Sequence, residues 1–399
     1  GLHTTSTADV ASIRFTISAS DMSTITRTVS YSGGTVSESF NVPNGSNRRF
    51  LVEALNSSGS VIYNGETTTN LNGSAVTLGI ALSAVTTAQL YVLVSNADSD
   101  NVSVIDPNTL TVQTTLNCSS LGDISCYEPR NLAISHAGTL AYIPFRHSDN
   151  VIKSHPDVPD FSLEISDDGF NEPYAVAFTA DDSEAWVVNK QGGGSSTGSV
   201  SIIDTSTQSV TDTIDDICFS SPEGIAIANG KAYVANRGDG TVCVVNVASR
   251  TVSTTISTGG SPRYAVATPN GNFVYVSTDS SSAGIKKIRT SDDTITATIA
   301  VRGRNLAVMP DGTKVYVATQ GNTIEVINVS NNSYSTITFT GAYSIYGVAI
   351  LSDSSYGFAT DEDRDVVYVF NPSTDTVVTT GGSPVEISVG STPRAIAAQ

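Results

Sequence analysis

From Gln89 onward, apolar and polar residues alternate with period two in short runs, and none of these runs has the spacing of an amphipathic helix. Segments such as AYVAN, VYVST and VYVAT combine an aromatic residue with β-branched residues, which is typical of strands. Turn sequences rich in Gly, Asn and Asp, such as TPNGN and MPDGT, separate the runs. The pattern predicts an all-β chain.

A short motif, PRNLAI in its first copy, divides this part of the chain into repeats of 40–49 residues. After each motif come a turn, a strand with an aromatic residue, a third apolar strand and a Thr/Val-rich strand. A period near 40–45 residues with four strands per unit is that of a β-propeller blade. The copies begin at Pro129, Pro173, Pro222, Pro262, Gly303, Ile345 and Pro393.

The two ends of the repeat region complement each other. The first unit begins with LYVLVSN, which corresponds to the second strand of a blade, and the chain ends with PRAIAAQ, which corresponds to a first strand. We therefore expect the C-terminal strand to pair beside Leu90–Ser95 and to close a ring of seven blades. Closure would pair the sheet edges that an open array leaves exposed.

The fifth residue of the six-residue motif is small in nearly every unit. Side chains near the axis of a propeller are crowded, and we expect this position to face neighbouring blades at the hub. It is occupied by Ala133, Ala177, Ala226, Ala307, Ala349 and Ala397, with Val266 as the exception.

The units resemble the YVTN family of β-propeller repeats over about Ala88–Gln399. The resemblance rests on segments such as Ala232–Ile256 and Val315–Phe339. It implies a propeller of the kind found in surface-layer and surface-antigen proteins, similar also to lactonase-type and dehydrogenase-associated propellers. The second unit departs from the pattern, because prolines in VIKSHPDVPDF are expected to interrupt its third strand and leave an irregular outer edge.

The segment before the propeller predicts a separate module. Residues 1–84 contain strand-like runs joined by Asn-Gly and Gly-Ser turns, and they are expected to form a small Ig-like β-sandwich, with the propeller at 85–399. The part RRFLVEALNSSGSVIYNGE looks like sandwich modules on secreted bacterial proteins. The Thr-rich start, GLHTTSTADV, is a candidate extended arm that lends a strand to a neighbouring subunit.

Composition and charge restrict the partners. The 399 residues carry a formal net charge of −18, with a pI near 4.4, and the basic residues form no patch beyond Lys286–Lys287. Such a negative field opposes binding to nucleic acid or anionic lipid. The sequence also has no apolar run of the ~18 residues that a membrane span needs. Gly1 is read as the start of an exported chain whose signal peptide was removed.

Four cysteines indicate the compartment. Cys118 and Cys126 flank a short loop and are expected to pair, and Cys218 with Cys243 is a second candidate pair; buried free thiols are the alternative. Two disulfides would fit an oxidising, extracellular environment. The chain has no Cys-x-x-Cys motif and only four histidines, so no structural zinc site is expected.

The main candidate binding residues share the second position of the motif, at the mouth of the expected channel. Four guanidinium groups there would hold an anion or a carboxylate ligand. The alternative is that each pairs with a nearby acid, such as Glu128 or Glu223. The four residues are Arg130, Arg263, Arg304 and Arg394.

Two acidic loops and three histidines are weaker candidates. The loops at 96–101 and 361–365 place Asp side chains at alternating positions that suit Ca²⁺, although solvated turns are the simpler interpretation. His136, His147 and His155 cluster in the second unit, where surface loops are expected.

The sequence shows no nucleophile with a paired base, no phosphate-binding loop and no Gly-x-Ser-x-Gly turn, and we therefore expect the chain not to be an enzyme. The favoured interpretation is a secreted or cell-surface protein for adhesion, recognition or assembly into a layer or fibre. Its partners would be other proteins or copies of itself, with carbohydrate as a further candidate. The competing interpretation is a lactonase-like hydrolase, or a binder of a small anion or carbohydrate, at the channel mouth.

Overall fold

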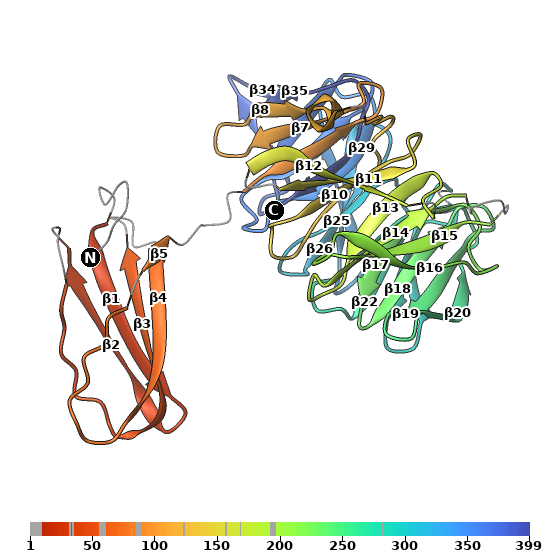
Figure 1. Cartoon of the computed structure of the whole chain (residues 1–399). Helices are drawn as coiled ribbons and strands as arrows, with labels where there is room; N and C mark the ends of the chain where they lie inside the picture. The colour runs from red at the N-terminus through yellow and green to blue at the C-terminus, as the bar shows by residue number, and fades with distance from the viewer. Residues whose placement is uncertain are drawn as a thin grey trace. The chain divides into compact units, whose positions relative to one another are not determined.

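A computed structural model describes residues 10–399 apart from 32, 34–35, 56–60, 81, 85–89, 123, 156–157, 168, 192–196 and 281. The chain divides into two compact units, Gly1–Gln89 and Leu90–Gln399, each described by itself below (Figure 1). Apart from a short 3₁₀ turn, η1 (Cys118–Leu121), the regular elements in the described part of the chain are β-strands, as predicted. None of the described elements is a helix with the length and apolar character to cross a membrane. The expected N-terminal arm, residues 1–9, lies outside the described residues.

The N-terminal unit is built on one antiparallel sheet in the order β2-β1-β3-β4-β5. One face of the sheet is polar and carries ion pairs from Arg14 to Glu53 and from Arg49 to Glu66. The other face carries Ile13 and its apolar neighbours. The strands are β1 (Ser12–Ala19), β2 (Met22–Ser30), β3 (Gly45–Leu55), β4 (Val61–Leu71) and β5 (Ser83–Ala84).

The second layer of the expected sandwich consists of two extended segments, 36–44 and 75–80, next to the apolar face. Along 36–43 the side chains alternate between half-buried and exposed, as in a strand. Neither segment belongs to a strand ladder within the described residues. The unit thus has a complete first sheet and an unpaired second layer.

The second unit is a propeller of seven antiparallel sheets in the described part of the chain, six with four strands and one, blade 7, with five. Blade 1 comprises β36 (Pro393–Ala398), β6 (Val92–Asn96), β7 (Asn101–Asp106) and β8 (Thr111–Leu116); blade 2 comprises β9 (Ala133–Ile134), β10 (Ala141–Phe145), β11 (Asn150–His155) and β12 (Val158–Ser166). Blade 3 comprises β13 (Pro173–Phe178), β14 (Glu184–Asn189), β15 (Ser199–Asp204) and β16 (Ser209–Ile214); blade 4 comprises β17 (Pro222–Ala228), β18 (Lys231–Asn236), β19 (Thr241–Asn246) and β20 (Thr251–Ser257). Blade 5 comprises β21 (Pro262–Ala267), β22 (Phe273–Thr278), β23 (Ile285–Arg289) and β24 (Thr294–Ile299); blade 6 comprises β25 (Leu306–Val308), β26 (Lys314–Ala318), β27 (Thr323–Asn328) and β28 (Tyr334–Thr338). Blade 7 comprises β29 (Ile345–Ile350), β30 (Gly357–Asp361), β31 (Val366–Asn371) and β32 (Thr376–Val377), with β35 (Glu386–Ser388) also on β31 and a small hairpin of β33 (Thr379–Thr380) and β34 (Ser383–Pro384) beside them in sequence.

The ring closes as the sequence predicts. The C-terminal strand β36 pairs antiparallel with β6, with Ile396 opposite Val94 and Ala398 opposite Val92. Ile396 is 5% exposed and packs with the apolar residues of blades 7 and 1. The last strand therefore supplies the inner strand that the first blade lacks in sequence order.

The hub is crowded. A Cβ atom added to Gly224 would lie 2.3 Å from the carbonyl oxygen of Arg263 in the next blade, so only glycine fits there. The small residues at the shared motif position also lie in the clusters between blades, as expected: Ala226 is 5% and Ala349 is 6% exposed.

Neighbouring blades are also joined by hydrogen bonds from tyrosines of the second strands. The hydroxyl of Tyr233 donates to Asp293 at 2.7 Å, and that of Tyr316 donates to Asp375 at 2.9 Å. Lys231 and Lys314 add ion pairs to the same two carboxylates. Each carboxylate lies in the turn between strands three and four of the following blade, so these pairs fix the rotation of one blade against the next.

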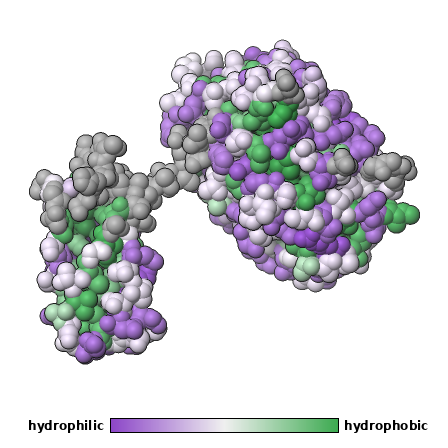
Figure 2. Space-filling model, in the orientation of Figure 1, coloured by the Kyte–Doolittle hydropathy of each residue, from purple (hydrophilic) through white to green (hydrophobic). Residues whose placement is uncertain are grey.

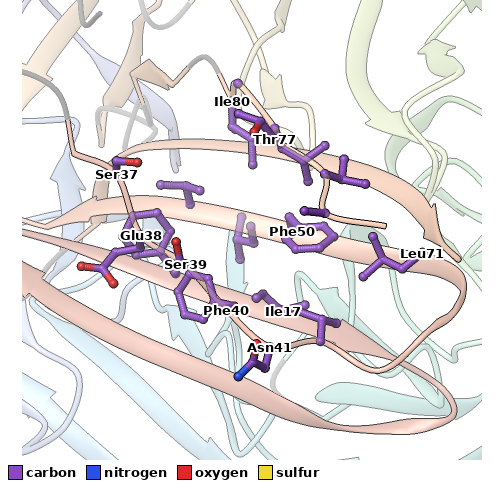
Figure 3. Close-up of a pocket in the computed structure, with 18 of the residues that line it drawn as sticks. Ile17, Ser37, Glu38, Ser39, Phe40, Asn41, Phe50, Leu71, Thr77 and Ile80 are labelled. Atoms are coloured by element: carbon purple, nitrogen blue, oxygen red, sulfur yellow. The ribbon is translucent and has the colours of Figure 1, made fainter. Parts of the chain in front are cut away.

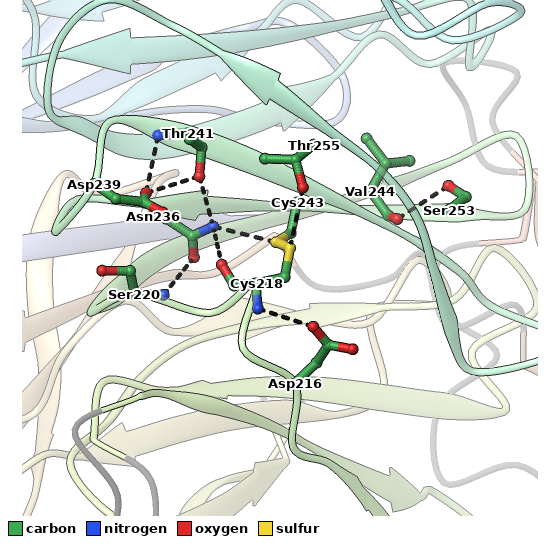
Figure 4. Close-up of a disulfide and its surroundings, with 10 residues drawn as sticks. All are labelled: Asp216, Cys218, Ser220, Asn236, Asp239, Thr241, Cys243, Val244, Ser253 and Thr255. Carbon is green, nitrogen blue, oxygen red and sulfur yellow. Dashed lines mark hydrogen bonds between the residues drawn. A yellow bond between two sulfur atoms is a disulfide. The ribbon is translucent and has the colours of Figure 1, made fainter.

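Both predicted disulfides form, and no free cysteine remains in the described residues, so the free-thiol alternative is wrong. Cys118–Cys126 closes the loop before blade 2, with Cα atoms 6.0 Å apart. Cys218–Cys243 ties the segment before blade 4 to β19, with Cα atoms 6.2 Å apart (Figure 4). Two disulfides fit an oxidising environment.

The second unit keeps its third strand, β11, in spite of the prolines that were expected to interrupt it. The irregularity lies instead in its pairing with the outermost strand β12, where the register shifts on both sides of Ser154. The prediction of an irregular outer edge holds, while that of a broken third strand is wrong.

Candidate functional site

The four motif arginines lie at the starts of the innermost strands, and each is paired with an acid across or within blades. The ion pairs at this mouth form two groups. The balanced network comprises Arg130, Arg146, Arg394, Glu128, Glu172 and Glu362. The cationic network comprises Lys190, Arg237, Arg263, Arg304, Glu223 and Asp279.

In the balanced network the formal charges cancel. Arg394 contacts Glu362 at 3.2 Å and Glu128 at 3.5 Å, and so joins blade 1 to blades 7 and 2. Glu128 also pairs with Arg130, and Arg146 continues the chain to Glu172 at 2.7 Å. Three arginines against three glutamates leave no surplus, so this half of the mouth is explained by blade-to-blade pairing.

In the cationic network four positive side chains surround two carboxylates. Glu223, with a side chain that is 1% exposed, accepts Arg263 Nη1 at 2.8 Å and pairs with Lys190 Nζ at 3.0 Å. The carboxylate of Asp279 forms ion pairs with Arg263 Nε at 2.5 Å and with Arg304 Nη1 at 2.9 Å. Four cations and two anions leave a formal charge of +2 on a chain whose total is −18.

Arg263 stands at the centre of this network. Burial lowers the pKa of its guanidinium, but the carboxylates of Glu223 and Asp279 outweigh burial and raise the pKa above its usual value. Arg263 is thus a fixed positive charge that is paired with two acids.

Arg237 is the least engaged cation of the network. Its ion pairs are long, 3.7 Å to Glu223 and 3.6 Å to Asp279, and its side chain is 41% exposed. Its buried Nε atom has no hydrogen-bond partner among the described residues. Because Nε is buried beside Asp279, the donors that this guanidinium can offer at the surface of the mouth are those of its Nη groups.

Below the ion pairs, aromatic and amide side chains fill the channel. The hydroxyls of Tyr264 and Tyr346 lie 3.5 Å apart, and their rings meet edge to face. The guanidinium of Arg130 lies 5.0 Å above the ring of Tyr174. Asn305 Nδ2 approaches Asn131 Oδ1 at 3.4 Å from the opposite side of the hub.

Next to these aromatic and amide side chains lies an apolar cavity of about 290 Å³. Its walls are mainly Ala, Val, Ile and Leu side chains of the innermost strands, including Ala307 and Ala349. Tyr264, Asn131 and Asn305 are its polar lining residues. The ion-paired mouth and this apolar cavity therefore differ in chemistry.

The buried tyrosines make stability sensitive to alkali. Burial raises the pKa of Tyr174 to about 12, and burial together with Tyr346 raises the pKa of Tyr264 well above its usual value. An unfolded tyrosine loses its proton near pH 10.0, and the folded one holds it, so the stabilisation is complete below pH 10.0 and is lost as pH rises above it. Urea unfolding at pH 8 to 11 should show a free energy that is flat up to about pH 10 and then falls. A Tyr174→Phe variant should lose less stability over the same interval, and equal slopes would contradict this account.

The weaker sequence candidates are occupied by local contacts. In the two acidic loops, Asp100 accepts the amide of Glu128 at 2.8 Å, and Asp361 accepts the amide of Tyr343 at 2.8 Å. Among the described residues no group of three or more His, Cys, Asp and Glu side chains gathers as metal ligands would. His136 pairs with Asp182 at 2.7 Å and His147 with Glu128 at 3.1 Å, and both side chains are more than half exposed.

Sequence reasoning missed the residues that make the mouth a site. Tyr174 and Tyr346 occupy the same motif position as the arginines, and an alignment by position would have found them. Lys190 and Arg237 come from the loops after the second strands, where no repeated pattern marks them. Their approach to Glu223 depends on the curvature of the ring.

The N-terminal unit contains the second candidate site, an open groove of about 1320 Å³ on the apolar face of its sheet. Figure 3 shows Ile17 and Phe50 between the segment that carries Ser37–Asn41 and the segment that carries Thr77 and Ile80. Apolar side chains reach the surface as a strip along this unit (Figure 2). The floor consists of Ile13, Phe15, Ile17, Phe50 and Val52.

The walls of the groove carry backbone groups without backbone partners, although the carbonyls of Ser39, Pro43 and Asn44 accept hydrogen bonds from the side chains of Arg27 and Arg48. Within the described residues, neither 36–44 nor 75–80 makes a backbone–backbone hydrogen bond. Unpaired, extended backbone beside an apolar floor is a template for an added strand.

Comparison with known proteins identifies the fold. No family model matches the chain, and no curated protein matches its sequence, so membership of the YVTN family is not confirmed. A functionally unknown protein from Desulfotomaculum acetoxidans is similar, with a TM-score of 0.59 and 18% identity over 75% of this chain and 99% of that one. Hydrazine synthase of Kuenenia stuttgartiensis has a TM-score of 0.55 and 14% sequence identity, over 70% of this chain and 91% of that one. The dihydro-heme d1 dehydrogenase NirN has a TM-score of 0.52 and 15% sequence identity, over 74% of this chain and 65% of that one.

These neighbours correct the expectation that the chain is not an enzyme. Hydrazine synthase and dihydro-heme d1 dehydrogenase are named as enzymes, so a propeller of this shape is no argument against catalysis. At 14–15% identity the likeness shows the fold alone, and it carries neither reaction to this chain.

Proposed function

We propose that the chain is an extracellular interaction protein that joins copies of itself through the groove of its N-terminal unit. The observation that carries the proposal is the groove itself, with an apolar floor and two walls of extended, unpaired backbone. Two disulfides support an oxidising, extracellular setting. The closed propeller would be the rigid body that the groove connects to its neighbour.

The occupant of the groove would be an extended strand. A strand lying between 36–44 and 75–80 would satisfy backbone N–H and C=O groups of both walls and cover the floor at Ile17 and Phe50. It would complete the second sheet of the sandwich. A globular ligand would leave those backbone groups unpaired.

Residues 1–9 of a second copy are the strand that fits best. In GLHTTSTAD the apolar residues Leu2 and Ala8 both lie at even positions, and the odd positions from His3 to Asp9 are all polar. That alternation suits a strand with one face in a groove. Nine residues extend about 30 Å, comparable with the eleven-residue strand β3 in the floor.

The first test is to remove the donor. Deletion of residues 1–9 should convert the assemblies of the full chain to single chains, as measured by light scattering and electron microscopy. The deletion must stop before Val10, because Val10 is 8% exposed and packs against Ile13 and Ala54. A lower melting temperature of an unassembled full chain upon deletion would instead mean that the segment fills the groove of its own chain, and the proposal would fail.

The second test is to block the acceptor and then recombine. Phe50→Glu places a charge on the groove floor and should also give single chains, whereas Thr68→Glu, on the opposite face of the sheet, should assemble normally. Mixing the deletion variant, which has an intact groove, with Phe50→Glu, which has an intact donor, should give dimers of one chain each. If the mixture stays unassembled, or if Phe50→Glu assembles like the full chain, strand exchange is refuted.

A further inference from the structure

We propose that the cationic network is a binding site for a small dicarboxylate anion, a role independent of assembly through the groove. The surplus of two positive charges is local to Lys190, Arg237, Arg263 and Arg304, and the balanced network of the same mouth has none. A ligand with two negative charges would neutralise it.

Arg237 is the principal contact in this proposal. Its side chain is partly exposed, and its ion pairs to Glu223 and Asp279 both exceed 3.5 Å, so the donors of its Nη groups are open to a ligand. The planar fork of a guanidinium matches a carboxylate with two parallel hydrogen bonds. One carboxylate of the ligand therefore lies on Arg237.

Lys190 supplies the second contact. Its Nζ atom lies 3.0 Å from Glu223 and 5.4 Å from the centre of the Tyr174 ring, at the same glutamate oxygen that Arg237 approaches. An ammonium has three donors, and the ion pair to Glu223 uses one of them. The remaining donors are close enough to Arg237 to hold the other carboxylate of a short ligand.

Arg263 and Arg304 act differently. Arg263 is committed to Glu223 and Asp279, and Arg304 Nε donates to Gln320 at 2.8 Å while its Nη1 pairs with Asp279. They hold the two carboxylates away from the ligand and contribute positive potential at short range. The net charge of −18 on the whole chain repels anions at long range, so the site favours small anions that enter the mouth over large acidic polymers.

Calorimetric titration of the full chain with succinate tests the proposal, at an ionic strength held constant with sodium chloride. One site per chain is expected. Arg237→Gln should weaken succinate binding about tenfold or more, the loss of one charge-assisted pair, and Arg237→Lys should weaken it less. Arg250→Gln is the matched control, because Arg250 also pairs with two acids, Glu184 and Asp212, but lies in the turn between β19 and β20 at the opposite end of the blade.

The outcomes separate cleanly. Tight succinate binding that Arg237→Gln weakens and Arg250→Gln leaves unchanged supports the site. Equal weakening by both arginine variants would show that general charge is responsible, and the proposal would be wrong. Binding of sulfate with no binding of succinate would contradict a dicarboxylate site, and a full chain that binds neither anion would refute any anion site at this mouth.

Discussion

A chain that lacks Pro393–Gln399 is expected not to form a stable propeller. Removal of β36 leaves β6 with an unpaired edge and exposes the apolar cluster between blades 7 and 1. The loss of a buried Ile such as Ile396 alone costs about 2–5 kcal/mol, and each lost backbone hydrogen bond adds roughly 0.5–1.5 kcal/mol. Because a folded domain is stable by only about 5–15 kcal/mol, the sum should remove most of the cooperative unfolding transition seen by circular dichroism.

Two controls isolate closure from simple shortening. Deletion of Gln399 alone removes one backbone hydrogen bond, to Tyr91, and should change the melting temperature little. A synthetic peptide STPRAIAAQ, added in excess to the truncated chain, should restore the transition by occupying the vacant place beside β6. A truncated chain that unfolds at the temperature of the full chain would show that the ring does not depend on its last strand.

Closure of the ring was predictable because it depends only on the number of strands in each repeat. The strand order within a unit is local, and a first strand missing at Leu90 matches a surplus one at Pro393. The disulfides were predictable from local spacing, since Cys118 and Cys126 flank a short loop, and Cys218 ends one repeat while Cys243 lies in a strand of the next. Repeats make contacts between adjacent units follow from the sequence of one unit.

The mouth was predictable only in part. Glu128 could be named as a partner because it stands two residues before Arg130, and Glu223 because it occupies the arginine position of the motif in its own unit. Lys190 and Asp279 could not, because they come from loops of other blades and reach the mouth only through the geometry of the closed ring. The charge surplus is a property of that arrangement.

The N-terminal unit shows a different limit. The strand-like alternation of 36–43 predicts an element of a second sheet, and the segment is extended as expected. Whether such a segment finds a partner is not encoded in its own pattern, since the partner must lie alongside. If the proposed exchange occurs, the pattern describes a sandwich that two chains complete together.

The second large effect is expected from Glu223→Gln. The side chain of Glu223 is 1% exposed and faces Arg263, Lys190 and Arg237. Removal of one partner from a buried ion pair leaves uncompensated charge and costs about 3–5 kcal/mol. We expect a loss of this size in the free energy of unfolding, measured by urea denaturation, even though glutamine has the same shape.

A control variant and a compensating second substitution both test whether the loss of stability comes from unpaired charge. Glu386→Gln removes an acid that is 34% exposed and pairs with Arg364, and exposed pairs contribute at most about 1 kcal/mol. Adding Arg237→Gln to Glu223→Gln removes one of the stranded cations, so the double variant should be more stable than Glu223→Gln alone. If the two single glutamate variants lose the same stability, or if the second substitution makes the first worse, the acids at the mouth do not act by compensating buried charge. The rigidity of the hub would then depend on the packing of small residues, such as Gly224, which leaves no room for a Cβ atom beside the backbone of Arg263.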